Sequence, residues 1–134
     1  MFGSLDISTS ALVAERTRMD AISANIAGRF ALEDAEGNYA PFRRRMAIFA
    51  SGDPSSGSTD GVHVREIAID QSALRKVYDP GHKFADRDGY VGYPNIDPAI
   101  EMVNALEASR AYEANITAAE ATKAMMQGAL RLLA

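Results

Sequence analysis

The chain has 134 residues, enough for one small domain, and its 18 acidic and 14 basic residues give a formal net charge of −4 at pH 7. This acidic balance argues against nucleic acid as a partner, because phosphate-backbone binding needs a basic surface. The absence of cysteine excludes disulfides, thiolate metal sites and cysteine nucleophiles. The longest apolar run, residues 46–50, is too short to span a bilayer, and the first residues lack the pattern of a cleaved signal peptide.

The N-terminal segment, residues 4–27, is expected to be a helix with a narrow apolar stripe. Its larger apolar residues recur every seven positions, with one addition: Leu5, Leu12, Met19 and Ile26, and Ile22. This spacing is typical of a coiled-coil seam. The alternative is a helix packed on an ordinary core, but such a helix usually has a wider apolar face.

A second, longer helix is expected from Asp97-Pro98 to residue 133, because Asp accepts from free N–H groups at a helix start and Pro suits the first helical position. Its expected seam has heptad-like spacing: Met102, Ala105, Ser109, Tyr112, Ile116, Ala119, Lys123, Met126, Leu130 and Leu133. A further apolar set points away from this seam: Ile100, Val103 and Leu106. One shorter helix cannot cover both sets, so another chain is expected to cover the surplus.

The middle of the chain is expected to form short antiparallel strands. The candidates are residues 42–50, 62–69, 74–78 and 89–93. The alternation slips at Arg65-Glu66, which indicates a β-bulge, and residues 51–60 predict a mobile polar loop or hairpin tip. The predicted fold is therefore mainly α with a small β subdomain (α+β). It comprises a helical arm, 1–30, a β-rich middle, 31–96, and a long helix, 97–134, that pairs with the arm as a coiled coil.

One cluster brings an imidazole and three carboxylates within ten residues: Asp79, His82, Asp86 and Asp88. These side chains could ligate a metal or support acid–base chemistry. The favoured interpretation is a structured turn, because Pro80-Gly81 and Asp88-Gly89 are turn dipeptides and Asp at such places usually bonds its own backbone. No cofactor, metal or catalytic site is expected.

Two polar features are candidates for contacts. The basic run Arg43, Arg44 and Arg45 is either a solvated edge strand guarded by charge, which is favoured, or a docking patch for an acidic neighbouring subunit. A polar cluster lies near the expected seam of the long helix: Arg110, Tyr112, Glu113 and Asn115. Polar groups at a helix contact can set register and partner, but these residues could equally be on the surface.

Several short motifs resemble those of a known family. They are Ser-Ala-Asn-Ile-Ala at 23–27, Tyr-Asp-Pro-Gly-His at 78–82, Gly-Tyr-Val at 89–91, Pro-Asn-Ile at 94–96 and Ser-Arg-Ala-Tyr-Glu-Ala-Asn at 109–115. These motifs resemble the bacterial flagellar rod and hook (axial) proteins, and their proximal-rod members in particular. The resemblance spans nearly the whole chain. One departure is Gly28-Arg29-Phe30, which stands where the family usually has further Asn residues.

The resemblance implies a non-catalytic structural subunit of the flagellar basal-body rod, exported by the flagellar type III apparatus and assembled in the periplasm. The implied partners are its own copies, other proximal and distal rod proteins, and the inner-membrane ring with its rod-adaptor region. In such proteins the terminal helices pair in an inner tubular layer and a β-rich part lies outside. The residues expected in helix and subunit packing are Leu5, Leu12, Met19, Ile22, Asn25, Ile26, Met102, Arg110, Tyr112, Asn115, Ile116, Met126 and Leu130.

Two other functions remain open. A freestanding helical adaptor or export-chaperone-like module would be a stable closed oligomer with ordered ends. A small metal-dependent enzyme would use the Asp79, His82, Asp86 and Asp88 cluster. For a rod subunit, burying a large apolar side chain contributes roughly 1.5–3 kcal/mol, while ordering each residue costs about 1–2 kcal/mol. Both arms are therefore expected to be frayed or disordered in the free monomer and completed by neighbouring subunits.

Overall fold

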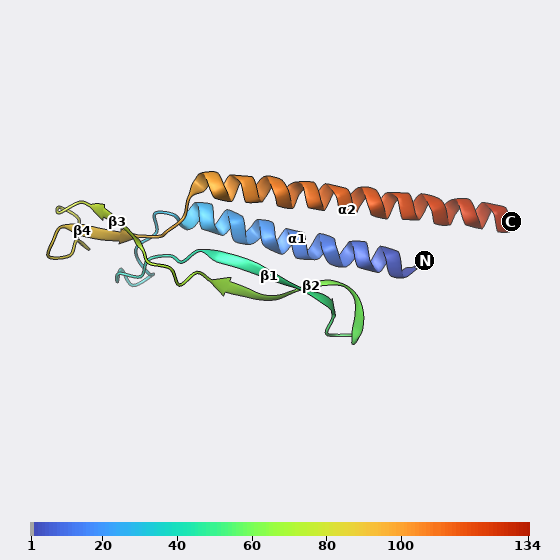
Figure 1. Cartoon of the computed structure of the whole chain (residues 1–134), viewed down its shortest axis with the longest axis horizontal. Coiled ribbons are helices and arrows are strands. Elements are labelled where there is room, and N and C mark those ends of the chain that lie inside the picture. The colour runs from blue at the N-terminus through green and yellow to red at the C-terminus, as the bar shows by residue number, and fades with distance from the viewer. Residues whose placement is uncertain (1) are drawn as a thin grey trace.

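A computed structural model describes residues 2–134 as two long antiparallel helices with two small sheets (Figure 1). Helix α1 spans Phe2–Gly28 and helix α2 spans Pro98–Leu133. Between them lie four strands: β1 (Arg45–Asp53), β2 (Ser58–Ile69), β3 (Arg75–Tyr78) and β4 (Tyr90–Tyr93). The α+β class expected from the sequence is confirmed. The coiled-coil geometry of the helix pair remains a prediction.

The helix boundaries follow from local chemistry. Asp97 caps α2, its carboxylate accepts a hydrogen bond from the Ala99 N–H at 2.8 Å, and Pro98 follows in the first turn. This confirms the predicted helix start. Helix α1 ends at Gly28, where a Cβ would come within 2.6 Å of the Phe42 ring. Glycine at this position therefore lets the chain pack closely as it returns toward the helix.

Strands β1 and β2 form a long antiparallel hairpin. Ile48 pairs with Glu66 whereas Phe49 pairs with Val64, so Arg65 is the additional residue. The bulge predicted at this place is confirmed. Residues 51–60, predicted as a mobile loop or hairpin tip, do form the tip, but only residues 54–57 are the turn, because residues 51–53 and 58–60 belong to β1 and β2. The Gly57 N–H donates to the Asp53 carbonyl there at 2.9 Å, and the mobility of the tip remains a prediction.

The two sheets lie in different places. The β1–β2 hairpin runs along α1 on the side away from α2 (Figure 1), and Val62 N–H donates to Ser10 Oγ at 3.1 Å. Strands β3 and β4 form a second antiparallel pair beyond the end of the helices where α1 stops and α2 begins. The middle segment therefore holds two separate two-stranded sheets, and its status as one domain remains a prediction.

The buried interior is small and divided between these two places. Along α1 the buried apolar residues include Ala14, Ala21 and Ile22. Around β3 and β4 they include Val91 and Ile96. Within residues 2–134, neither helix is both long and apolar enough to cross a membrane.

Candidate functional site

The seam between α2 and α1 is built from small side chains. Ala108 of α2 is fully buried, and Ala105, Ala111 and Ala119 are half-buried on the same side of the helix. Among the helices and strands, α2 packs only against α1, so this buried side is the side that faces α1. Small residues at a helix contact allow the two backbones to approach closely.

Most large apolar residues of α2 lie outside this seam and are exposed. Their exposed fractions run from 37% for Ile116 to 89% for Leu132. The set is Ile100, Met102, Val103, Leu106, Ile116, Met125, Leu130, Leu132 and Leu133.

For the contact within the chain, the seam expected from the sequence is therefore wrong at its exposed members: Met102, Ile116, Lys123, Leu130 and Leu133. Its members Ala105 and Ala119 lie on the buried side, because the close contact with α1 selects small residues. Tyr112 is half-buried, as a member of the seam would be, and Met126 is half-buried near the point where α1 begins. A role of the exposed residues in packing between subunits remains a prediction.

On α1, the expected packing residues are all at least half-buried. Ile22 is 6% exposed and Asn25 is fully buried, whereas the others are half-buried: Leu5, Leu12, Met19 and Ile26. This helix also has a second buried set, which was not predicted from the sequence. It consists of the small residues Ala14, Ala21 and Gly28, which also recur every seven positions. That repeat was the signal that could have found it.

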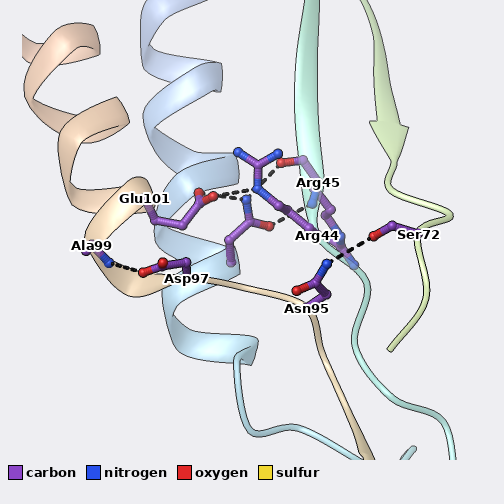
Figure 2. A network of polar contacts seen from close by, with 8 residues as sticks. Arg44, Arg45, Ser72, Asn95, Asp97, Ala99 and Glu101 are labelled. Atoms are coloured by element: carbon purple, nitrogen blue, oxygen red, sulfur yellow. Dashed lines mark hydrogen bonds and ion pairs between the residues drawn. The ribbon is translucent and has the colours of Figure 1, made fainter. Parts of the chain in front are cut away.

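A buried polar node closes one end of the helix pair (Figure 2). The Asn25 Nδ2 group donates to Glu101 Oε2 at 3.0 Å and to the Arg45 carbonyl at 2.8 Å, and Asn25 Oδ1 accepts from the Arg45 N–H at 2.7 Å. Arg44 Nε donates to Glu101 Oε1 at 2.5 Å. The node therefore joins α1, the entry to β1 and the first turn of α2.

The node satisfies a carboxylate that is almost fully buried. Glu101 is 1% exposed, and a buried charge costs several kcal/mol unless it is paired and hydrogen-bonded. Here both of its oxygens have partners, Arg44 and Asn25, and the N-terminal end of a helix also favours negative charge. Sequence analysis did not single out Glu101. Its place in the first turn after the Asp97 cap was the available signal.

The arginine run has contacts inside the chain at every position. Arg44 binds Glu101, Arg43 Nη1 donates to the Ser72 carbonyl at 2.7 Å, and the Arg45 guanidinium lies 5.1 Å from the Phe42 ring centroid. Arg44 is thus a structural residue of the node. The favoured interpretation of the run as a solvated edge strand is wrong for Arg43 and Arg44, which precede β1 and are half-buried. A docking role for the run remains a prediction.

Charged groups also line the middle of the seam. Arg18 Nη2 of α1 reaches Glu107 Oε2 of α2 at 3.2 Å. Glu15 is buried beside them, and its Oε2 is 3.7 Å from Arg18 Nη1, without a hydrogen bond. Burial raises the pKa of the Glu15 carboxyl above its usual value, while Arg18 opposes this shift.

Further along α2, the predicted polar cluster is only partly involved in the seam. Asn115 is half-buried and its Nδ2 donates to the Ala111 carbonyl at 2.8 Å. Tyr112 is half-buried as well, whereas Arg110 is exposed.

The Asp79 to Asp88 segment forms the structured turn that joins β3 to β4. Asp86 Oδ1 accepts from the N–H groups of Asp88 and Tyr90 at 3.0 and 2.8 Å, and His82 Nδ1 accepts from the Phe84 N–H at 3.1 Å. In the part of the chain that the structure describes, no group of three or more acidic or histidine side chains is placed to hold a metal ion. The side chains of this turn bond their own backbone, as the favoured interpretation expected.

Comparison with known proteins identifies the family. The family model for the flagellar basal body rod FlgEFG protein C-terminal region matches residues 87–132. Flagellar basal-body rod protein FlgC of Bacillus subtilis (strain 168) is 41% identical over 98% of this chain and 97% of its own length. The chain belongs to the FlgC family. FlgC of Borreliella burgdorferi is 37% identical over 99% of this chain and 97% of its own, and FlgC of Escherichia coli O157:H7 is 35% identical over 95% and 93%.

Membership of the FlgC family makes the chain a structural, non-catalytic protein of the bacterial flagellar basal-body rod. The resemblance found in the motifs is thereby confirmed. The adaptor hypothesis gains no support from these relatives. The family-model match includes β4 and nearly all of α2, the helix whose large apolar side chains are exposed.

Proposed function

We propose that the chain enters the rod as an incomplete building block, whose exposed apolar residues on α2 are covered by neighbouring subunits. The observation behind this proposal is the distribution of side-chain size on α2. Alanines such as Ala108 face α1, whereas large residues such as Val103 and Leu106, 60% and 62% exposed, point away from it. Complete coverage of one such large side chain contributes roughly 1.5–3 kcal/mol, so several together can drive assembly.

The partners in this proposal are its own copies and the other proximal and distal rod proteins, with the inner-membrane ring and the rod-adaptor region at the base. Contacts between unlike faces can propagate as a helical tube, because they need not close into a ring. The paired helices would then form the inner layer of the rod and the two small sheets would lie outside it.

We further propose that the chain reaches the periplasm through the flagellar type III export apparatus. The absence of cysteine supports this route, since no disulfide would have to be reduced before passage as an unfolded chain. The small interior, which is divided between two places, also supports this route. A fold with so little buried apolar surface is expected to have a low free energy of unfolding.

Replacement of Leu106 by Asp tests whether a neighbouring subunit covers the exposed apolar face of α2. Leu106→Asp should be absent from purified basal bodies and should abolish motility, because a charge would be buried without a partner at the subunit contact. The free protein should unfold at nearly the same urea concentration as the wild type, since Leu106 is 62% exposed within the chain.

The matched control is Leu106→Met, which keeps the apolar volume and should assemble normally. Rods that contain Leu106→Asp at the wild-type level would show that this face is not covered by a neighbour.

A further inference from the structure

A hollow with a volume of about 760 Å³ lies between α1 and the β1–β2 hairpin. This volume is in the range of roughly 300–1,000 Å³ that protein pockets use to hold a bound group. Its apolar lining includes Ile7 and Val13 of α1, which are 44% and 62% exposed, and the half-buried Val62 and Val64 of β2. The cleft therefore offers uncovered apolar surface on both of its walls.

The carboxylates that line this cleft give it acidic character, and its other polar lining consists of Ser and Thr hydroxyls and the imidazole of His63. Asp6 comes from α1, and Asp53 and Asp60 come from the two strands of the hairpin. Among the described residues that line the cleft there is no Lys or Arg. Hydrogen bonds from Ser55 and Ser56 lower the pKa of Asp53 to about 2, so this carboxylate is ionised at neutral pH. The occupant that fits best is apolar with a positive charge.

The C-terminal end of α2 has this chemistry. The contacts of Asn25 with Glu101 and of Arg18 with Glu107 fix an antiparallel register in which the beginning of α1 falls opposite about residue 124 of α2. Beyond that point α2 continues without a partner (Figure 1).

This overhang, residues 125–133, presents strongly exposed apolar side chains: Met125, Leu130, Leu132 and Leu133. Arg131 is its only charged residue. The overhang therefore matches the cleft both in apolar character and in the sign of its charge.

The overhang cannot fill the cleft of its own molecule. Helix α1 lies between α2 and the hairpin, and within the described residues α2 contacts neither β1 nor β2 (Figure 1). A contact between overhang and cleft must therefore join two molecules. It would use unlike surfaces, so that a pair of copies keeps one free overhang and one free cleft for further copies.

We propose that the cleft between α1 and the β1–β2 hairpin receives the α2 overhang of a second copy of this chain. This inference rests on the proposed role as a rod building block and specifies one of its contacts. Arg131 of one copy lies near the carboxylates of the other, and the leucines beside it cover the apolar walls.

Paired cysteines test the contact in assembled rods, because the natural chain has none. A chain with both Val13→Cys and Leu132→Cys should give disulfide-linked dimers and larger multimers of itself when purified basal bodies are oxidised. The matched control, Val13→Cys with Val103→Cys, should give no such multimers, although Val103 is about as exposed as Val13.

Basal bodies that contain the first variant but yield no self-linked product, or a product linked to a different protein, would overturn this inference. The role as a rod subunit would stand, because the variant would be present in the rod. If the chain were not a rod subunit, the wild-type protein would be absent from purified basal bodies.

Charge reversal in the purified chain gives a second test, which does not require that the variants enter the rod. Arg131→Glu and Asp60→Lys should each weaken self-association in sedimentation about tenfold, equal to about 1.4 kcal/mol. The double variant should recover most of the loss, because the opposite charges meet again. Equal association of all four proteins, or a wild type that remains monomeric at millimolar concentration, would contradict the contact.

Discussion

Asn25 joins three segments of the chain through one carboxamide. Its Nδ2 binds the Glu101 carboxylate and the Arg45 carbonyl, and its Oδ1 accepts from the Arg45 N–H. Each of these groups would be left without its Asn25 partner if the amide were removed, and an unsatisfied buried polar group costs about 1–3 kcal/mol. Asn25 therefore contributes to stability by satisfying other groups more than through its own packing.

Asn25→Ala should lower the free energy of unfolding by about 3 kcal/mol, because it leaves polar groups of Arg45 and Glu101 without this partner. Urea unfolding followed by circular dichroism measures this loss. Asn95→Ala is the control, since Asn95 is exposed and makes a single 3.3 Å bond to Ser72 Oγ. It should cost less than about 0.5 kcal/mol. Equal stability of the two variants would show that the node does not stabilise the fold.

Glu15 makes the stability depend on pH. Burial raises the pKa of its carboxyl above the ordinary 4.5, so the native state binds this proton more tightly than the unfolded chain does. The favourable contribution is complete below pH 4.5 and is lost as the pH rises through the raised pKa. Arg18, 3.7 Å away, only partly offsets the cost of the buried charge, and Glu107 adds to it.

Glu15→Gln should therefore be more stable than the wild type at pH 7, and the difference should shrink as the pH falls toward 4.5. Thermal unfolding at a series of pH values measures it. The control is Glu113→Gln, which changes an exposed carboxylate on α2. A wild type that is the more stable protein at pH 7 would show that the ion pair with Arg18 outweighs the burial cost.

At the scale of the element, α2 separates two tasks onto two faces. The face toward α1 is made of alanines and polar groups, and close approach of the helices requires it to stay narrow. The other face displays large apolar residues that the chain itself does not cover. Stability of the monomer and assembly should therefore respond to different substitutions on the same helix.

Ala108→Leu should destabilise the monomer by about 1–3 kcal/mol, because Ala108 is fully buried and a larger side chain forces the helices apart. Ala118→Leu, at an exposed position of the same helix, is the control and should have little effect. Urea unfolding of the two proteins gives the comparison. An Ala108→Leu protein as stable as the wild type would show that the helices can move apart without loss of stability.

At the scale of the whole molecule, tertiary contacts become fewer along the helix pair from the polar node to the C-terminal end of α2. One end is fixed by the polar node, the middle of α1 is covered by both α2 and the hairpin, and the overhang of α2 has no partner. An isolated helical end without tertiary contacts is only marginally stable in water. The disorder of both arms in the free monomer remains a prediction, and we expect it to be most pronounced in the overhang.

Hydrogen exchange of the dilute monomer should show fast exchange for amides of residues 125–133 and strong protection around Ala108. The same overhang amides should become protected in assembled rods. Protection of the overhang equal to that around Ala108 in the free monomer would contradict the view that this end is completed by a neighbour.

The sequence alone determined features that depend on a few neighbouring residues. The Asp97-Pro98 helix start, the bulge at Arg65 and the turn after β3 were all predictable, because capping, strand register and Asp–backbone hydrogen bonds are local. The motifs also indicated the family, since they extend along nearly the whole chain.

Only the tertiary structure decided which face of α2 is buried and what closes the helix pair. Met102 belonged to the expected seam and Ala108 did not, but the close approach of α1 buries the alanine and leaves the larger residue exposed. The partnership of Glu101 with Asn25 and Arg44 joins residues far apart in the sequence, so no local pattern could predict it. Burial depends on the space that the assembled elements leave, and this space is a property of the fold as a whole.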